Sequence, residues 1–182
     1  MHPLKHLSKT LAALASADHF LFTRSDVSAL LPELSVGALK ALLSRAVKDG
    51  LLSRVCRGVY LYERADFPRG QILFHTAARL RADTFSYLSL ETVLSDTGAI
   101  SQMPMQWITL MSAGRSAVIR CGGWGTIEFV HTRKTPELVT DQLHYDSRCH
   151  LWRASLALAM QDMRATRRSL DLVDWSVVNE SV

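Results

Sequence analysis

The feature that most constrains this chain's fold is a series of short helical segments followed by two strand-like segments, all within the first 64 residues. Residues 3–16 carry leucines spaced three and four apart, which is the period of an amphipathic helix. Two more helices are predicted at residues 24–31 and 36–49, with Pro32 in the short link between them. A link of this length is typical of a helix-turn-helix.

Three polar residues mark where the second and third helices begin. Thr23 suits the N-cap position of the second helix, and Asp26 three residues later completes a capping-box pattern. Ser35 suits the N-cap of the third helix, and Gly50 follows its last turn as a plausible stop. The caps therefore support two separate helices in place of one long one.

The two strand-like segments, residues 51–56 and 59–62, lie on either side of Arg57 and Gly58. Glycine readily takes the positive φ angle that a tight hairpin turn requires. Three helices followed by a basic two-stranded ribbon is the order of a winged helix-turn-helix. We therefore expect a DNA-binding domain of this kind over residues 1–64.

The charge of the chain is concentrated in the same region. Residues 1–64 contain nine Lys and Arg against five Asp and Glu, whereas residues 65–182 contain twelve of each. The whole net charge of +4 therefore lies in the first third of the chain. This segregation favours a polyanionic partner for residues 1–64.

In a winged helix-turn-helix, the third helix enters the major groove. Lys40 and Ser44 lie one turn apart on that helix and could reach base edges, whereas Arg45 and Lys48 suit phosphate contacts. We expect the start of the second helix to offer backbone N–H groups and a hydroxyl to a phosphate. The expected DNA-binding residues are Thr23, Arg24, Ser25, Ser35, Val36, Lys40, Ser44, Arg45, Lys48, Arg54 and Arg57. The alternative is that these are solvated charges on a small helical domain.

Residues 65–182 are predicted to form a second, α+β domain. Helices are expected at residues 71–81, 88–97 and 151–163, and strands at residues 107–111, 117–121 and 126–131. The polar segment from Glu63 to Gly70 separates the two domains. The predicted fold class is thus α+β: a winged helix-turn-helix, then helices around a small antiparallel sheet.

The sequence shows no constellation typical of an enzyme, and we predict neither catalytic residues nor a cofactor. The glycine-rich segment at residues 122–125 lacks the Lys-Ser/Thr of a phosphate-binding loop and suits a hairpin turn. His131, His144, Cys149 and His150 match no zinc spacing, so no metal site is expected. Ser112 or Ser116 with His131 lacks the third, orienting group of a catalytic triad.

Three features predict a cytoplasmic protein that does not enter a membrane. The longest apolar run is far shorter than the roughly 20 residues that span a bilayer. The three cysteines, Cys56, Cys121 and Cys149, are odd in number and widely spaced, which fits thiols kept reduced in a cytosol. The first residues lack the apolar core of a signal peptide, so no leader is expected.

Three segments of the chain resemble the AbiEi family of antitoxins from type IV toxin–antitoxin systems. They are the run Gly50-Leu-Leu-Ser-Arg-Val-Cys-Arg-Gly-Val-Tyr60, the stretch Tyr87-Leu-Ser-Leu-Glu-Thr-Val-Leu94, and the helix Arg153-Ala-Ser-Leu-Ala-Leu-Ala-Met-Gln-Asp162. The resemblance implies a repressor that binds inverted repeats in its own promoter. It also implies a second domain that counters a nucleotidyltransferase-like toxin.

Two other classes of protein remain open at this stage. One is a winged-helix regulator that senses a ligand or a metal through the Cys and His residues of its second domain. The other is an enzyme whose helix-turn-helix only positions a catalytic domain. The sequence has no long dimerisation helix, so we expect a monomer that pairs only on DNA.

Overall fold

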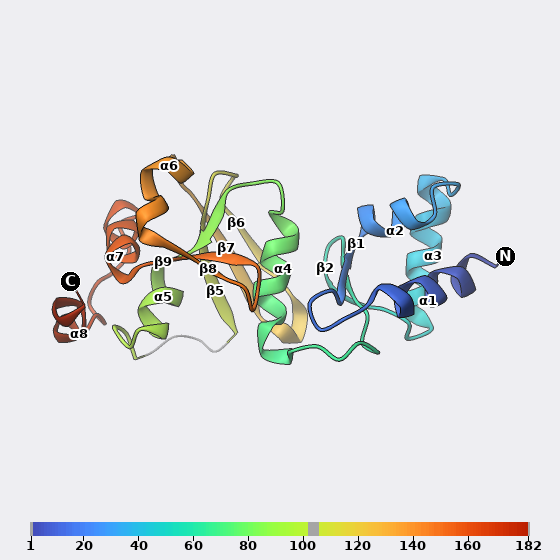
Figure 1. Ribbon diagram of the computed structural model, residues 1–182, viewed down its shortest axis with the longest axis horizontal. Coiled ribbons are helices and arrows are strands. Elements are labelled where there is room, and N and C mark those ends of the chain that lie inside the picture. The colour runs from blue at the N-terminus through green and yellow to red at the C-terminus, as the bar shows by residue number, and fades with distance from the viewer. Residues whose placement is uncertain (1, 102–105, 182) are drawn as a thin grey trace. The chain divides into compact units, whose positions relative to one another are not determined.

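The computed structural model describes residues 2–101 and 106–181, and the chain divides into two compact units, Met1–Ile72 and Leu73–Val182 (Figure 1). The division follows Ile72, whereas the sequence predicted a boundary after Arg64. The difference arises because the intervening segment packs on the first unit. The ring of Phe67 stacks on that of Phe20 with 5.1 Å between centroids, and Ala65 contacts the core of the first unit.

The first unit contains three helices and a three-stranded antiparallel sheet in the order β1-β3-β2. Its elements are α1 (Pro3–Leu14), β1 (Leu21–Thr23), α2 (Arg24–Leu30), α3 (Val36–Lys48), β2 (Ser53–Cys56), β3 (Val59–Leu61) and the 3-10 turn η1 (Arg69–Gln71). The predicted helices and hairpin are present. Strand β1 was not predicted, and it extends the hairpin by pairing Leu21 with Leu61 and Thr23 with Val59.

Both predicted helix caps form in the first unit. The Thr23 hydroxyl accepts a hydrogen bond from the Asp26 backbone N–H (3.1 Å), and the Asp26 carboxylate accepts one from the Thr23 N–H (2.6 Å). The Ser35 hydroxyl accepts from the Ala38 N–H at 3.2 Å. These bonds use backbone donors that a helix leaves without intrahelical partners, and so fix where α2 and α3 begin.

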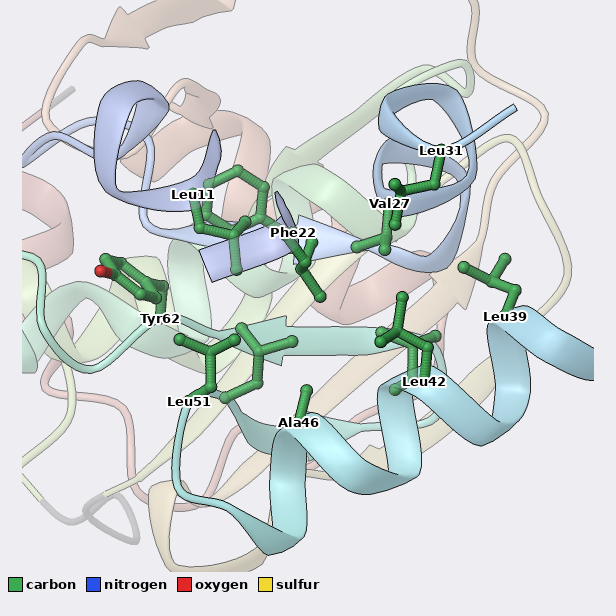
Figure 2. Close-up of a cluster of buried hydrophobic side chains, with 12 residues drawn as sticks. Leu11, Phe22, Val27, Leu31, Leu39, Leu42, Ala46, Leu51 and Tyr62 are labelled. Carbon is green, nitrogen blue, oxygen red and sulfur yellow. The ribbon is translucent and has the colours of Figure 1, made fainter. Parts of the chain in front are cut away.

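One hydrophobic cluster holds the three helices against the sheet (Figure 2). Its buried members are Leu7, Leu11, Phe22, Val27, Leu31, Leu39, Leu42, Leu43, Ala46, Leu51, Leu52 and Tyr62. Figure 2 shows Leu39, Leu42 and Ala46 along one face of α3, directed at the side chains of the other elements. The inward face of α3 is therefore occupied by core contacts, and its opposite face is left to solvent.

The second unit is built on a six-stranded sheet in the order β6-β7-β5-β4-β9-β8. Its strands are β4 (Ser86–Leu88), β5 (Trp107–Ser112), β6 (Ala117–Arg120), β7 (Thr126–His131), β8 (Leu143–Asp146) and β9 (Leu151–Ala154). Its helices are α4 (Ile72–Leu80), which begins at the division, α5 (Leu90–Asp96), α6 (Pro136–Val139), α7 (Leu156–Ala165) and α8 (Trp175–Glu180), with 3-10 turns η2 (Gly122–Trp124) and η3 (Thr140–Gln142).

The α+β class is confirmed, but the sheet of the second unit is larger than predicted and mixed. Strands β5 and β7 are parallel, as are β4 and β9, whereas the other pairs are antiparallel. The predicted helix over residues 151–163 is wrong at its start. Its first four residues form β9, and the Ser155 hydroxyl then caps α7 by accepting from the Leu158 N–H at 3.1 Å.

A buried carboxylate on α7 joins that helix to β4, to the residue that follows β4 and to the segment after β7. Asp162 on α7 is fully buried and accepts hydrogen bonds from the Tyr87 hydroxyl (3.0 Å) and the Ser89 hydroxyl (2.7 Å). Its other oxygen lies 2.6 Å from the Lys134 ammonium. Burial, together with the adjacent Asp162 carboxylate, raises the pKa of Tyr87 above its ordinary value. Two of the segments that carry the family resemblance, around Tyr87 and Asp162, thus meet at one buried site.

Candidate nucleic-acid interface

The outward face of α3 carries several of the residues predicted to contact DNA. Because Leu39, Leu42, Leu43 and Ala46 are buried, the positions between them face solvent, and Lys40 and Ser44 are both exposed. Val36, in the first turn, is 62% exposed. Val36 is not a member of the buried core cluster, so much of its side chain is open to solvent.

A hollow of about 520 Å³ lies between this face of α3, the start of α2 and the β2–β3 hairpin. We call it the basic groove. Its lining residues are Arg24, Lys40, Leu43, Ser44, Val47, Arg54, Arg57, Gly58 and Tyr60. Four of them are cations and none is acidic. The fold therefore brings together, from separate elements, basic side chains that are up to 33 positions apart in the chain.

Not all of the predicted residues line the basic groove. Arg45 and Lys48 are exposed in the later turns of α3, and Ser25 is exposed on α2. Ser35 is exposed as well, but its hydroxyl already accepts the capping bond from Ala38. These four residues are close in sequence to residues that line the groove, but they do not line it themselves.

The start of α2 differs from the expectation that its first N–H groups are available to a phosphate. The Thr23 N–H donates to Asp26, and the Arg24 N–H donates to the Gly58 carbonyl at 3.0 Å. The Thr23 hydroxyl is likewise engaged as the cap. What Arg24 presents to the groove is its side chain, since its backbone N–H is used to hold the hairpin turn.

The hairpin that corresponds to the wing is fixed at its tip. Gly58 has φ +82°, a left-handed conformation that glycine adopts without strain. The strand before it is irregular between Arg54 and Cys56, and the Arg54 Nε donates to the Cys56 carbonyl at 3.3 Å. These contacts hold the Arg54 guanidinium, and the bond from Arg24 holds the turn of the hairpin beside Arg57.

Tyr60 lines the groove, although it was absent from the sequence prediction. It is half-buried on β3, where Val59 and Leu61 are buried on the opposite side of the strand. Alternation along a strand could have indicated this, because neighbouring residues face opposite sides. Its side chain is neutral, whereas the charge pattern of the hairpin indicates only the arginines.

The candidate catalytic and metal-binding residues of the second unit have other partners. The Ser116 hydroxyl accepts from the His131 backbone N–H (2.9 Å), while the His131 ring contacts the Gly114 carbonyl (3.0 Å). Ser112 is buried against Ser86, with 2.9 Å between their hydroxyls. Burial raises the pKa of the Cys149 thiol to about 11. The described residues contain no cluster of three His, Cys, Asp or Glu that could hold a metal ion.

Three helices, an antiparallel hairpin fixed to the second helix, and a groove lined by cations define a winged helix-turn-helix domain of the DNA-binding class. Residues 9–62 match the family model described as "Transcriptional regulator, AbiEi antitoxin". The match covers the first of the three segments that resemble the AbiEi antitoxins, residues 50–60, and confirms the resemblance for the first unit. No curated protein matches the chain. Within the described residues, no helix is both long and apolar enough to span a bilayer.

Proposed function

We propose that this protein represses the promoter of its own toxin–antitoxin operon by binding duplex DNA through the basic groove. The observation that carries the proposal is the gathering of Arg24, Lys40, Arg54 and Arg57 around one hollow without an acidic neighbour in its lining. If these cations were only solvated surface charges, there would be no reason for four of them, from three separate elements, to line the same hollow. A phosphate backbone is the polyanion that this arrangement fits.

The proposed contacts follow from where the side chains lie. With α3 in the major groove, Lys40 and Ser44 face base edges, and Val36 lies in the first turn where thymine methyl groups are reached. Arg45 and Lys48 contact phosphates from the later turns of the helix. Arg54 and Arg57 contact the backbone, or the flanking minor groove, from the hairpin.

We further propose that two copies bind an inverted repeat, each copy reading one half-site, and that the free protein is a monomer. The second unit would counter a nucleotidyltransferase-like toxin. The inverted repeat and the toxin are what the resemblance to the antitoxin family implies, and the monomer is expected because the sequence has no long dimerisation helix.

The first experiment is a titration of the full chain against its own upstream DNA and a scrambled duplex, at two salt concentrations. Tighter binding to the upstream DNA, weakening steeply as salt rises, is the expected result. Lys40→Ala should weaken binding to the upstream DNA more than to the scrambled duplex. Lys9→Ala is the matched control, because Lys9 is an exposed cation on α1 outside the groove lining.

Failure to bind either duplex would contradict the proposal and would indicate that the first unit binds a protein. Equal loss from Lys40→Ala on both duplexes would leave DNA binding intact but remove Lys40 as a base-reading residue. If Lys9→Ala weakened binding as much as Lys40→Ala does, the net charge of the protein, and not the groove, would set the affinity.

The antitoxin role is tested separately in cells that express the neighbouring gene product. Co-expression of the full chain should restore growth, and co-expression of the Lys40→Ala variant should restore it equally well under an independent promoter. Lack of rescue by the full chain would contradict the antitoxin role without affecting the DNA-binding proposal.

A further inference from the structure

The second unit contains a hollow of about 370 Å³ at the end of the sheet where β4 and β9 begin. Its lining includes the segment between α4 and β4 and the hairpin of β8 and β9. A hollow of this size lies within the range of small-molecule sites. It is unrelated to the basic groove, since all its lining residues belong to the second unit.

One side of this hollow is an aromatic platform formed by Tyr145 and Trp152. The two residues are directly paired across β8 and β9, and their ring centroids are 5.2 Å apart at an interplanar angle of 63°. Their exposed fractions are 49% and 44%, which is high for rings of this size. Large aromatic side chains exposed at a concave surface are typical of ligand sites.

The platform is held in place before any ligand binds. The Tyr145 hydroxyl lies 3.2 Å from the His150 Nδ1, and the His150 ring meets that of His75 edge-on, with 5.6 Å between centroids. The His75 Nε2 in turn lies 2.9 Å from the Arg148 carbonyl oxygen. His150 also has φ +57°, a conformation uncommon for a residue with a side chain. The Tyr145 ring, which these contacts hold and which Trp152 meets edge-on, therefore loses little freedom when a planar group binds beside it.

The polar residues of the lining determine which planar group fits. The Thr84 hydroxyl donates to one Asp83 carboxylate oxygen at 3.2 Å, and the other carboxylate oxygen can accept a hydrogen bond from an exocyclic amine or a ring N–H. The cation of the lining, Arg81, is already committed. Its guanidinium carbon lies 4.6 Å from the Phe129 ring centroid, and its Nη2 donates to the Arg115 carbonyl at 2.7 Å.

We propose that this hollow binds a planar nitrogen heterocycle of the purine type, stacked on the face of Trp152, with the inclined Tyr145 ring beside it. Asp83 hydrogen-bonds to the edge of the heterocycle. Because Arg81 is engaged by Phe129 and Arg115, the ring and not a phosphate is the group recognised. A free nucleoside and its monophosphate therefore bind with similar affinity.

The test is calorimetric titration of the full chain with adenosine, guanosine and AMP. The expected result is saturable binding of at least one of the two nucleosides, with AMP within about threefold of adenosine when adenosine binds. Trp152→Ala should weaken binding by about tenfold or more, and Trp152→Phe should restore most of the affinity, because stacking requires only an aromatic face. Asp83→Asn should weaken the binding of the heterocycle without affecting folding, since Asp83 is exposed.

The matched control is Trp175→Ala, which removes a tryptophan of 43% exposure that lies outside the hollow, at the start of α8. This variant should bind within about twofold of the unaltered protein. Absence of binding by both nucleosides, or an equal loss in Trp152→Ala and Trp175→Ala, would overturn the proposal. AMP binding more than about tenfold tighter than adenosine would also overturn it, since a phosphate would then be the group recognised.

Discussion

At the scale of single residues, the DNA-binding proposal predicts that the loss of different cations changes the DNA affinity in different ways. A residue that contacts phosphate lowers affinity for every sequence when it is removed, whereas a residue that reads a base lowers affinity for one sequence. Arg57 lies beside the turn of the hairpin, whose position is fixed by the bond between the Arg24 N–H and the Gly58 carbonyl. It is therefore the clearest candidate for a pure backbone contact.

We expect Arg57→Ala to weaken binding to the upstream DNA and to a scrambled duplex by the same factor. The slope of log affinity against log salt should fall by about one, as expected for the loss of one phosphate contact. Filter-binding or fluorescence titrations at several salt concentrations measure both quantities. Unchanged affinity and slope would place the hairpin away from the backbone.

Two glycines of the second unit, Gly122 and Gly125, differ in the space around their Cα atoms. Gly122 is the first residue of η2 and Gly125 follows its last residue, and both have positive φ, at +55° and +120°. A Cβ at Gly122 would meet nothing within 4 Å, whereas a Cβ at Gly125 would run into the backbone carbonyl oxygen of Gln106. That oxygen also accepts the Thr126 N–H at 2.7 Å, so it cannot move freely.

Gly122→Ala should thus lower the free energy of unfolding by about 1 kcal/mol, which is the ordinary cost of a left-handed alanine. Gly125→Ala should lower it by about 3 kcal/mol or more, because its backbone conformation is open essentially to glycine alone. Urea unfolding of the two variants measures the difference. Equal effects would show that Gln106 does not approach Gly125 as closely as described.

At the scale of elements, the helices of the first unit could be predicted from the sequence because capping residues mark where α2 and α3 begin. Thr23, Asp26 and Ser35 form the expected capping bonds, and Gly58 forms the expected turn. Strand β1 was missed because Leu21, Phe22 and Thr23 are too few to show an alternating pattern, and only pairing with β3 makes them a strand.

The same reasons explain the errors in the second unit. Strand β4 has three residues, and β9 was merged with α7 because apolar residues continue through both. A short apolar run is compatible with a strand or a helix until its partners are known. The groove residues on α3 could be predicted from helical period and charge, but Tyr60 and the engaged N–H groups at Thr23 and Arg24 depend on tertiary contacts.

The capping box offers an element-scale prediction. Thr23→Ala and Asp26→Ala should each lower the free energy of unfolding of the first unit by about 1 kcal/mol, the usual value of a helix cap. The double variant should cost less than the sum, because the two bonds are reciprocal and share both residues. Chemical unfolding monitored by circular dichroism measures the cycle, and strict additivity would argue against a reciprocal pair.

At the scale of the whole molecule, each compact unit has buried thiols that report on its opening. Cys56 belongs to the first unit, and Cys121 and Cys149 belong to the second; all three are buried and free of disulfide bonds. At pH 8 we expect all three to react with a thiol reagent at least about 100-fold more slowly than in denaturant, because reaction requires local or global opening. Cys56→Ala leaves only the thiols of the second unit and so separates the two rates.

The pH dependence of the free energy of unfolding provides a second test of whether the Cys149 thiol is buried. The pKa of Cys149 is raised to about 11 in the folded chain, so the unfolded chain loses this proton at lower pH. The stabilisation from the neutral thiol is therefore complete below about pH 9 and is lost as pH rises toward 11. Unfolding of Cys149→Ala should lack this component, and an identical pH dependence in both proteins would contradict the burial of Cys149.

The bond between the Arg24 N–H and the Gly58 carbonyl, with the pairing of β1 and β3, has a calorimetric consequence. A hairpin already anchored to a helix has its conformational entropy removed during folding, so DNA association requires little further ordering of the chain. Burial of apolar surface on binding gives a negative heat-capacity change. For a hairpin that is already ordered, this change should be no more negative than the apolar area buried at the protein–DNA contact alone predicts. A substantially more negative value would reveal coupled folding of the hairpin tip.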